Sequence, residues 1–153
     1  MKRVFVQGSY DLINAGHVRS FHDIVEKFTE GCGSDACNCK QKPYLIVGLN
    51  SDELMMEHKG RVIIPFEQRK EILLALKDVS QIYKCDSPDA MDALSNLPVD
   101  VFCTVPEWVD RQKEAIDHVE SKGGEVYLLK YYPEDGEILS STAIRERVIK
   151  GAA

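Results

Sequence analysis

The sequence lacks a long apolar run. Its first residues include Lys2 and Arg3 but no apolar stretch long enough for a signal peptide, and no run approaches the length of a membrane span. It also lacks a basic excess, since 19 Lys and Arg stand against 25 Asp and Glu for a net charge of −6. Binding to nucleic acid or to a membrane surface needs a basic footprint, so we expect neither. We expect a cytoplasmic protein that meets any anionic ligand with a few local cations.

The cysteines lack the spacing of a metal site. Cys32, Cys37 and Cys39 lie in a glycine-containing, polar segment at about residues 30–43, which we interpret as a loop insertion. A single residue separates Cys37 from Cys39, and no second Cys-x-x-Cys or His pair completes a zinc set. Part of a zinc site is the alternative, but we favour a surface loop. Cys85 and Cys103 fall at the ends of predicted strands, where small buried thiols are common.

No internal repeat, low-complexity segment or linker divides the 153 residues. Apolar runs alternate with helical patterns, which predicts βαβ units with right-handed crossovers. We therefore expect one α/β domain over residues 1–153, a Rossmann-like doubly wound five-stranded parallel sheet with helices on both faces. The expected strands are residues 4–7, 44–49, 80–85, 99–105 and 125–130. Helices are expected after the first glycine turn, through residue 56, and over 65–77, 89–97, 107–121 and 140–150.

The first predicted strand ends in a glycine turn, Gly8-Ser9-Tyr10-Asp11-Leu12-Ile13-Asn14-Ala15-Gly16-His17, which leads into a helix. Such a turn directs backbone N–H groups and the positive end of the helix dipole into one place, which suits a phosphate. His17 falls in the first turn of that helix, on the face that carries Val18 and Phe21. Its imidazole is therefore expected to donate a hydrogen bond to a bound oxyanion.

Arg69 is the least expected residue of the helix predicted over 65–77. It stands in the middle of an otherwise apolar face made of Phe66, Ile72, Leu73 and Leu76. A buried guanidinium without a partner is strongly destabilising. Its partner is either an internal carboxylate, such as Asp11, or a ligand phosphate, and we favour the ligand because the arginine fork suits phosphate.

Two further segments suit an anion. Lys59 and Arg61 flank Gly60 in a basic turn, where they could close over a phosphate and stabilise charge that builds up during its transfer. Three consecutive hydroxyl residues, Ser140 to Thr142, precede a helical pattern with Arg145 just inside it. Helix capping explains one hydroxyl. The three together indicate a second anion site.

These segments resemble the signatures of one family. Gly8 to Leu12 followed by Asn14 to His17 is similar to the Gly-Thr-Phe-Asp and His-x-Gly-His motif of the cytidylyltransferase-like nucleotidyltransferases. Leu139 to Arg145 resembles their second motif, Ile-Ser-Ser-Thr-x-Ile-Arg. Lys59 and Arg69 match the loop lysine and the helix arginine of the family. The likeness is strongest to the small glycerol-3-phosphate cytidylyltransferases.

The resemblance implies transfer of CMP from CTP to a small phosphorylated alcohol, of the phosphocholine, phosphoethanolamine or glycerol 3-phosphate type, with release of pyrophosphate. It also implies a homodimer and Mg²⁺ that comes with the nucleotide, without a metal site made by the protein. The implied catalytic residues are His17, Lys59, Arg69 and Asn14. The implied nucleotide-binding residues are Gly8, Ser9, Tyr10, Asp11, Gly16, His17, Trp108, Ser140, Ser141, Thr142 and Arg145.

The sequence departs from the family pattern at three places. Asn14 stands where the family has its first histidine, and the turn Val105-Pro106-Glu107-Trp108 differs from the usual Gly-Asp-Asp-Trp type. The arginine that precedes the second motif has no counterpart. Two alternatives follow: an adenylyltransferase acting on a mononucleotide or a sugar phosphate, or a nucleotide-binding protein whose catalysis Asn14 has weakened.

Overall fold

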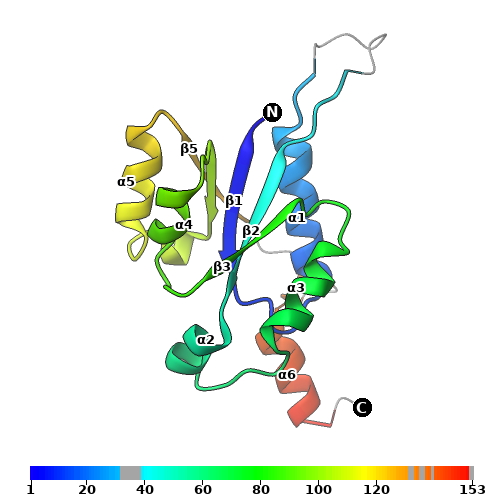
Figure 1. The fold of residues 1–153 in the computed structure, drawn as a ribbon. Helices are drawn as coiled ribbons and strands as arrows, with labels where there is room; N and C mark the ends of the chain where they lie inside the picture. The colour runs from blue at the N-terminus through cyan, green and yellow to red at the C-terminus, as the bar shows by residue number, and fades with distance from the viewer. Residues whose placement is uncertain (32–38, 131–132, 135–136, 139, 152–153) are drawn as a thin grey trace.

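A five-stranded parallel sheet forms the centre of the computed structural model, which describes residues 1–31, 39–130, 133–134, 137–138 and 140–151 (Figure 1). The strand order is β3-β2-β1-β4-β5, and every neighbouring pair is parallel. The strands are β1 (Arg3–Gly8), β2 (Tyr44–Asn50), β3 (Gln81–Cys85), β4 (Val101–Thr104) and β5 (Glu125–Leu128). The predicted Rossmann-like fold is confirmed.

Helices cover both faces of this sheet because its central strands are apolar on both sides. On one face, α1 (Ala15–Phe28) and α3 (Phe66–Leu74) pack against Val4, Val6 and Val47. On the other face, α4 (Met91–Asn96) and α5 (Lys113–Ser121) pack against Phe5 and Phe102. Figure 1 shows the two helix pairs on opposite sides of the strands. Two more helices, α2 (Asp52–Lys59) and α6 (Ser141–Ile149), lie near the ends toward which the strands point.

Several predicted boundaries were wrong. The helix expected from residue 107 begins at Lys113, because the 3-10 helix η1 (Pro106–Trp108) and a turn come first. The helix expected to reach residue 77 ends at Leu74. A short antiparallel pair, β6 (Pro133–Glu134) and β7 (Glu137–Ile138), precedes α6 and was not predicted. Val18 and Ile72 were assigned to core faces but are 38% and 41% exposed.

A backbone bridge joins the two ends of the predicted insertion. Glu30 and Gln41 form an antiparallel bridge, with N···O distances of 3.0 Å and 2.7 Å. Residues 32–38, with Cys32 and Cys37, lie outside the described residues, so the zinc alternative stays open. Cys85 and Cys103 are buried as predicted, and burial raises the pKa of the Cys85 thiol to about 12. No helix in the described part of the chain is long and apolar enough to cross a membrane.

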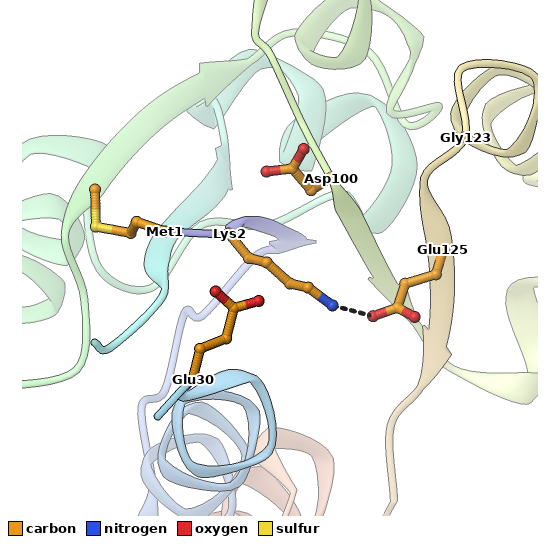
Figure 2. Close-up of a pocket in the computed structure, with 6 residues that line it drawn as sticks. All are labelled: Met1, Lys2, Glu30, Asp100, Gly123 and Glu125. Carbon is orange, nitrogen blue, oxygen red and sulfur yellow. Dashed lines mark hydrogen bonds and ion pairs between the residues drawn. The ribbon is translucent and has the colours of Figure 1, made fainter. Parts of the chain in front are cut away.

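The strands begin at what we call the amino edge of the sheet and end at the carboxyl edge. The amino edge contains a hollow of about 400 Å³ lined by Met1, Lys2, Glu30, Asp100, Gly123 and Glu125 (Figure 2). Lys2 Nζ donates to Glu125 Oε1 at 3.3 Å, and the backbone N–H of Arg3 donates to Asp100 Oδ2 at 2.8 Å. This edge is therefore dominated by carboxylates.

Candidate active site

The strand order reverses between β1 and β4, and ligands of doubly wound sheets bind at the carboxyl edge beside such a reversal. The N-terminal turn, residues 8–14, leaves β1 there. A Cβ atom on Gly8 would lie 2.8 Å from the buried ring of Tyr10, so the close approach of that ring requires a glycine. Tyr10 itself has the left-handed φ of 48°, an uncommon conformation for an aromatic residue. The predicted glycine turn thus depends on Tyr10 as well.

Asn14 and His17 form a capping box at the start of α1. Asn14 Oδ1 accepts from the N–H of Gly16 at 2.9 Å, and Asn14 Nδ2 donates to the carbonyl of Leu12 at 3.1 Å. The N–H of Asn14 donates to His17 Nδ1 at 3.3 Å. Histidine here takes the place of the glutamate or glutamine that usually closes such a box. Asn14 therefore shapes the helix start, and its predicted contact with a phosphate remains a prediction.

The capping box also fixes the chemistry of His17. Because Nδ1 accepts a hydrogen bond, the neutral ring carries its proton on Nε2. Burial and the nearby Lys59 lower the pKa of His17 to about 4. The ring packs edge-on against Tyr10, with 5.1 Å between centroids. At neutral pH His17 is thus an uncharged, oriented donor through Nε2.

The second predicted anion segment meets the first. Ser141 Oγ, at the start of α6, donates to the carbonyl of Leu12 in the N-terminal turn at 3.0 Å. Residues 129 positions apart are joined by this bond, so the first turns of α1 and α6 are neighbours. The two segments that were predicted to bind anions therefore lie beside each other.

The three hydroxyls of that segment have different partners. Ser140 is the N-cap of α6, and its Oγ accepts from the N–H of Ala143 at 3.1 Å. Thr142 Oγ1 accepts from the guanidinium of Arg145 at 3.1 Å. The hydroxyl protons of Ser140 and Thr142 take no part in these two bonds, whereas Ser141 donates its proton to Leu12. Arg145 Nε is buried without a hydrogen-bond partner among the described residues.

Lys59 is the cation whose charge acts on His17. It ends α2, and Gly60, with a left-handed φ of 69°, reverses the chain after it. Partial burial and the neighbouring Arg61 lower the pKa of Lys59, whereas Asp11 raises it. The charge of Lys59 therefore acts on His17, and that of Asp11 acts on Lys59.

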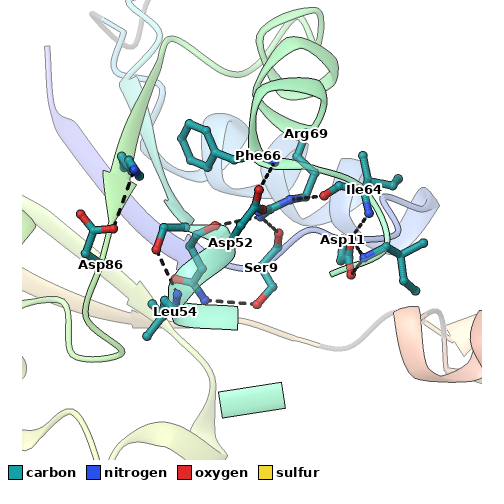
Figure 3. A network of polar contacts seen from close by, with 12 residues as sticks. Ser9, Asp11, Asp52, Leu54, Ile64, Phe66, Arg69 and Asp86 are labelled. Atoms are coloured by element: carbon teal, nitrogen blue, oxygen red, sulfur yellow. Dashed lines mark hydrogen bonds and ion pairs between the residues drawn. The ribbon is translucent and has the colours of Figure 1, made fainter. Parts of the chain in front are cut away.

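Arg69 has an internal partner, but the partner is Asp52. Arg69 is fully buried, and its Nη2 donates to Asp52 Oδ1 at 2.6 Å (Figure 3). Its other nitrogens donate to the carbonyls of Ser9, Asn50 and Ile64 at 2.7, 2.9 and 2.8 Å. The choice of a ligand phosphate as the partner of Arg69 is therefore wrong for this structure, and so is Asp11 as the internal alternative. Its assignment as a catalytic residue stays untested.

Asp11 serves the backbone of the α2–α3 loop, residues 60–65. Its carboxylate accepts from the N–H of Ile63 at 2.9 and 3.2 Å and from the N–H of Ile64 at 2.7 Å. Asp11 is 8% exposed, which leaves little of it for a nucleotide. Sequence reasoning missed both the Asp11–loop contact and Asp52, although Asp52 follows Ser51 at a recognisable helix start.

Trp108 lies after β4, on the other side of the strand-order reversal. It ends η1 and is 41% exposed. The buried Thr104, at the end of β4, and Gln112 hydrogen-bond to each other. An exposed indole beside the carboxyl edge suits a flat base, but nothing in the geometry selects one base over another.

The described residues contain no group of three or more His, Cys, Asp or Glu side chains placed to hold a metal ion. Asp11 and Asp52 are engaged by loop amides and by Arg69. The side chains at the carboxyl edge therefore do not fit a protein-held Mg²⁺. The predicted Mg²⁺ would be held mainly by nucleotide phosphates, as is common for this ion.

The doubly wound sheet has two helix starts, a neutral histidine and a lysine at its carboxyl edge, an arrangement typical of nucleotide-binding domains. The sequence matches the Cytidylyltransferase-like family over residues 5–147. The chain belongs to this family, as the two sequence motifs had indicated. It is therefore a nucleotidyltransferase-type domain.

Two individual relatives share less than 30% of their residues with this chain. The chain is 29% identical to the bifunctional protein HldE of Alcanivorax borkumensis, covering 95% of this chain but 27% of that protein. It is 27% identical to the FAD synthase of Ferroglobus placidus, covering 97% of this chain and 89% of that one. The chain thus spans about a quarter of the HldE length and nearly all of the FAD synthase.

A solved structure supports the fold. The lipopolysaccharide core biosynthesis protein from Thermoplasma volcanium superposes with a TM-score of 0.66 at 16% identity, covering 87% of this chain and 99% of that one. At this identity the likeness concerns the fold alone.

Proposed function

We propose that this protein transfers a nucleoside monophosphate from a nucleoside triphosphate to a phosphate monoester and releases pyrophosphate. The observation that carries the proposal is the hydrogen bond from Ser141 Oγ to the Leu12 carbonyl. It brings together the first turns of two helices, and helix N-termini are favourable places for phosphate groups. Family membership over residues 5–147 supports the same chemistry.

The reaction needs no general base. An oxygen of the acceptor phosphate attacks the α-phosphorus in line, a new P–O bond forms, and the bond to the bridging oxygen of pyrophosphate breaks with its electron pair. A phosphate monoester has its second pKa near ~6, so the nucleophile is already ionised at neutral pH. Catalysis then consists of positioning and charge stabilisation.

The side chains suit these tasks. His17 is neutral, so it acts as a hydrogen-bond donor through Nε2 to an oxygen of the reacting phosphate and does not act as a cationic acid. Lys59 adds positive charge where the transition state becomes more negative. The hydroxyl protons of Ser140 and Thr142, with the guanidinium of Arg145, are suited to the outer phosphates.

The nucleotide remains to be chosen between two candidates. CTP, with a small phosphorylated alcohol as acceptor, follows from the motif resemblance described above. ATP is the second candidate, because the FAD synthase relative shares nearly its whole length with this chain and FAD contains an adenylyl group joined to a flavin phosphate. Mg²⁺ accompanying the nucleotide and a homodimeric assembly belong to the proposal as well.

The experiment supplies the purified protein with each of the four nucleoside triphosphates, Mg²⁺ and a panel of phosphate monoesters. Pyrophosphate release and the mass of the product are measured, and the mass of the protein in solution gives the oligomeric state. Release with CTP and a phosphorylated alcohol supports the first candidate, and release only with ATP supports the second. Nucleotide binding without turnover in any mixture contradicts nucleotidyl transfer.

The Asn14→His variant tests the remaining alternative. If the wild type binds nucleotide without turnover and the variant acquires activity, the protein is a nucleotide-binding member in which Asn14 has weakened catalysis. If the wild type and Asn14→His turn over at similar rates, Asn14 acts only as a helix cap.

A further inference from the structure

Two buried charged residues, Asp11 and Arg69, hold the backbone of Ile64 at its N–H and at its carbonyl. Its N–H donates to Asp11 Oδ1 at 2.7 Å, and its carbonyl accepts from Arg69 Nε at 2.8 Å. The preceding N–H, of Ile63, donates to both oxygens of Asp11. Figure 3 shows Asp11, Ile64 and Arg69 side by side in this arrangement. The α2–α3 loop is thus tied to the N-terminal turn.

The other end of α2 is tied to the same place. Asp52, the first residue of α2, pairs with Arg69 and also accepts from the N–H of Phe66 at 3.2 Å. Arg69 in turn donates to the carbonyl of Ser9 in the N-terminal turn. Lys59 ends α2 five residues before Ile64. Both ends of the segment that carries Lys59 are therefore fixed to the turn that leads to His17.

We propose that Asp11 is a positioning residue for Lys59: its carboxylate holds the α2–α3 loop by backbone hydrogen bonds and so keeps the lysine ammonium beside His17, without touching the nucleotide. Arg69 completes the arrangement from the other side of the loop. This inference rests on the proposed function for its effect on turnover, but its structural part does not depend on any activity.

Three features of Asp11 favour this role. Its two oxygens are directed at loop amides, and it is 8% exposed, so it has little surface to offer a ligand. A carboxylate directed at a triphosphate would repel it, whereas one that faces amides does not. Asp11 also raises the pKa of Lys59 against the effects of burial and of Arg61, which favours the charged amine at the position where it is needed.

Amide hydrogen exchange tests the tether directly. In Asp11→Ala, we expect the amides of Ile63 and Ile64 to exchange at least about tenfold faster, while those of the central strand β2 keep their protection. Asp11→Asn retains one acceptor oxygen and should give a smaller increase. The matched control is Asp100→Ala, which removes a carboxylate that accepts a backbone N–H at the amino edge. Unchanged exchange at Ile63 and Ile64 in Asp11→Ala overturns the proposal.

A double-mutant cycle tests how Asp11 acts. We expect Asp11→Ala to lower kcat by about 10–100-fold with little change in KM, since small displacements of catalytic groups have effects of this size. In a Lys59→Ala background, Asp11→Ala should cause little further loss, because its effect passes through Lys59. Fully additive losses mean that Asp11 acts on the nucleotide itself and overturn the proposal. Absence of turnover in the wild type contradicts the proposed function, while the exchange measurement still decides the tether.

Discussion

The carboxylates at the two edges of the sheet have different surroundings. At the amino edge, three carboxylates and one lysine, Lys2, line a hollow. The carboxylates are those of Glu30, Asp100 and Glu125. At the carboxyl edge, Asp11 and Asp52 are directed at backbone amides and at Arg69. In a chain with a net charge of −6, Asp11 and Asp52 at this edge are thus engaged by partners within the protein.

The backbone adds to this difference. In a parallel βαβ fold, each helix that follows a strand begins at the carboxyl edge, so its N–H groups and dipole favour anions there. The first turns of α1 and α6 meet through Ser141 and Leu12. Lys59 and Arg145 add their cations to the same edge. The comparison therefore predicts that substitutions at one edge change turnover and that matched ones at the other do not.

The largest difference is expected for His17→Ala against Lys2→Ala. Removal of a transition-state donor typically lowers kcat by about 10²–10³, and we expect a loss of this size for His17→Ala in steady-state nucleotidyl transfer. Lys2→Ala removes a cation from the amino edge and should leave kcat within about twofold, because Lys2 pairs with Glu125 far along the strands from the site.

His17→Gln separates the donor from the cap. Glutamine is a usual residue at this position of a capping box, so this variant keeps the start of α1 intact. Its amide can donate but cannot take the place of the fixed imidazole. We expect a kcat between those of the wild type and His17→Ala. Equal turnover in all three proteins would remove His17 from the mechanism.

The pKa of His17 is about 4 in the folded protein, against the ordinary 6.5. We therefore expect His17 to contribute roughly 3 kcal/mol to the free energy of unfolding at neutral pH, a contribution that is lost at low pH. Between pH 6.5 and 4 the unfolded chain binds a proton that the folded protein excludes, so the free energy of unfolding falls as the pH is lowered. Above pH 6.5 this contribution is fully present. Denaturant unfolding of the wild type and His17→Gln across this range measures it.

The result is read from the difference between the two proteins. Other groups titrate in both, so their contributions cancel, and His17→Gln should lose less stability than the wild type on acidification. Parallel curves for the two proteins would show that the His17 pKa is ordinary in the folded state.

Much of the fold could be predicted because local patterns determine it. The apolar strands, the glycine turn after β1 and the hydroxyl cap of α6 each act over a few residues. Helix boundaries near Pro106 were less predictable, since a 3-10 helix and an α-helix start are similar in sequence. The parallel pairing follows from the alternation of strands and helices, whereas the strand order β3-β2-β1-β4-β5 was not predicted.

The site was predictable by residue type more than by contact. The misfit of Arg69 in an apolar face correctly indicated a buried guanidinium, yet the partner came from α2, because sequence spacing identifies a buried charge but not the distant element that meets it. The donation from His17 to a bound oxyanion stays a prediction. The capping bond of His17 with Asn14 was missed because histidine is an unusual residue at that position of the box.

We expect a smaller difference, in the free energy of unfolding, between Gly8→Ala and Gly31→Ala. A Cβ on Gly8 would lie 2.8 Å from the ring of Tyr10, so the buried ring must move, and overpacking of this kind costs about 1–3 kcal/mol. Among the residues that the structure describes, a Cβ on Gly31 would meet Lys40 Cγ at 3.7 Å, an ordinary contact. Chemical denaturation of both variants measures the difference. A stability loss of equal size at the two positions would mean that Tyr10 does not fill the space beside Gly8.

The smallest effect is expected for Glu125→Gln at the amino edge. Glu125 pairs with Lys2, but their side chains are 54% and 39% exposed, and exposed ion pairs contribute about 0–1 kcal/mol. The free energy of unfolding should change by less than about 1 kcal/mol, and 1 M salt should abolish most of the difference because it screens such pairs. Turnover should stay at the wild-type value, because the variant changes charge only where the sheet begins. A clear change in kcat would mean that the charges of the amino edge influence the phosphate-binding edge, and the separation of the two edges would then be wrong.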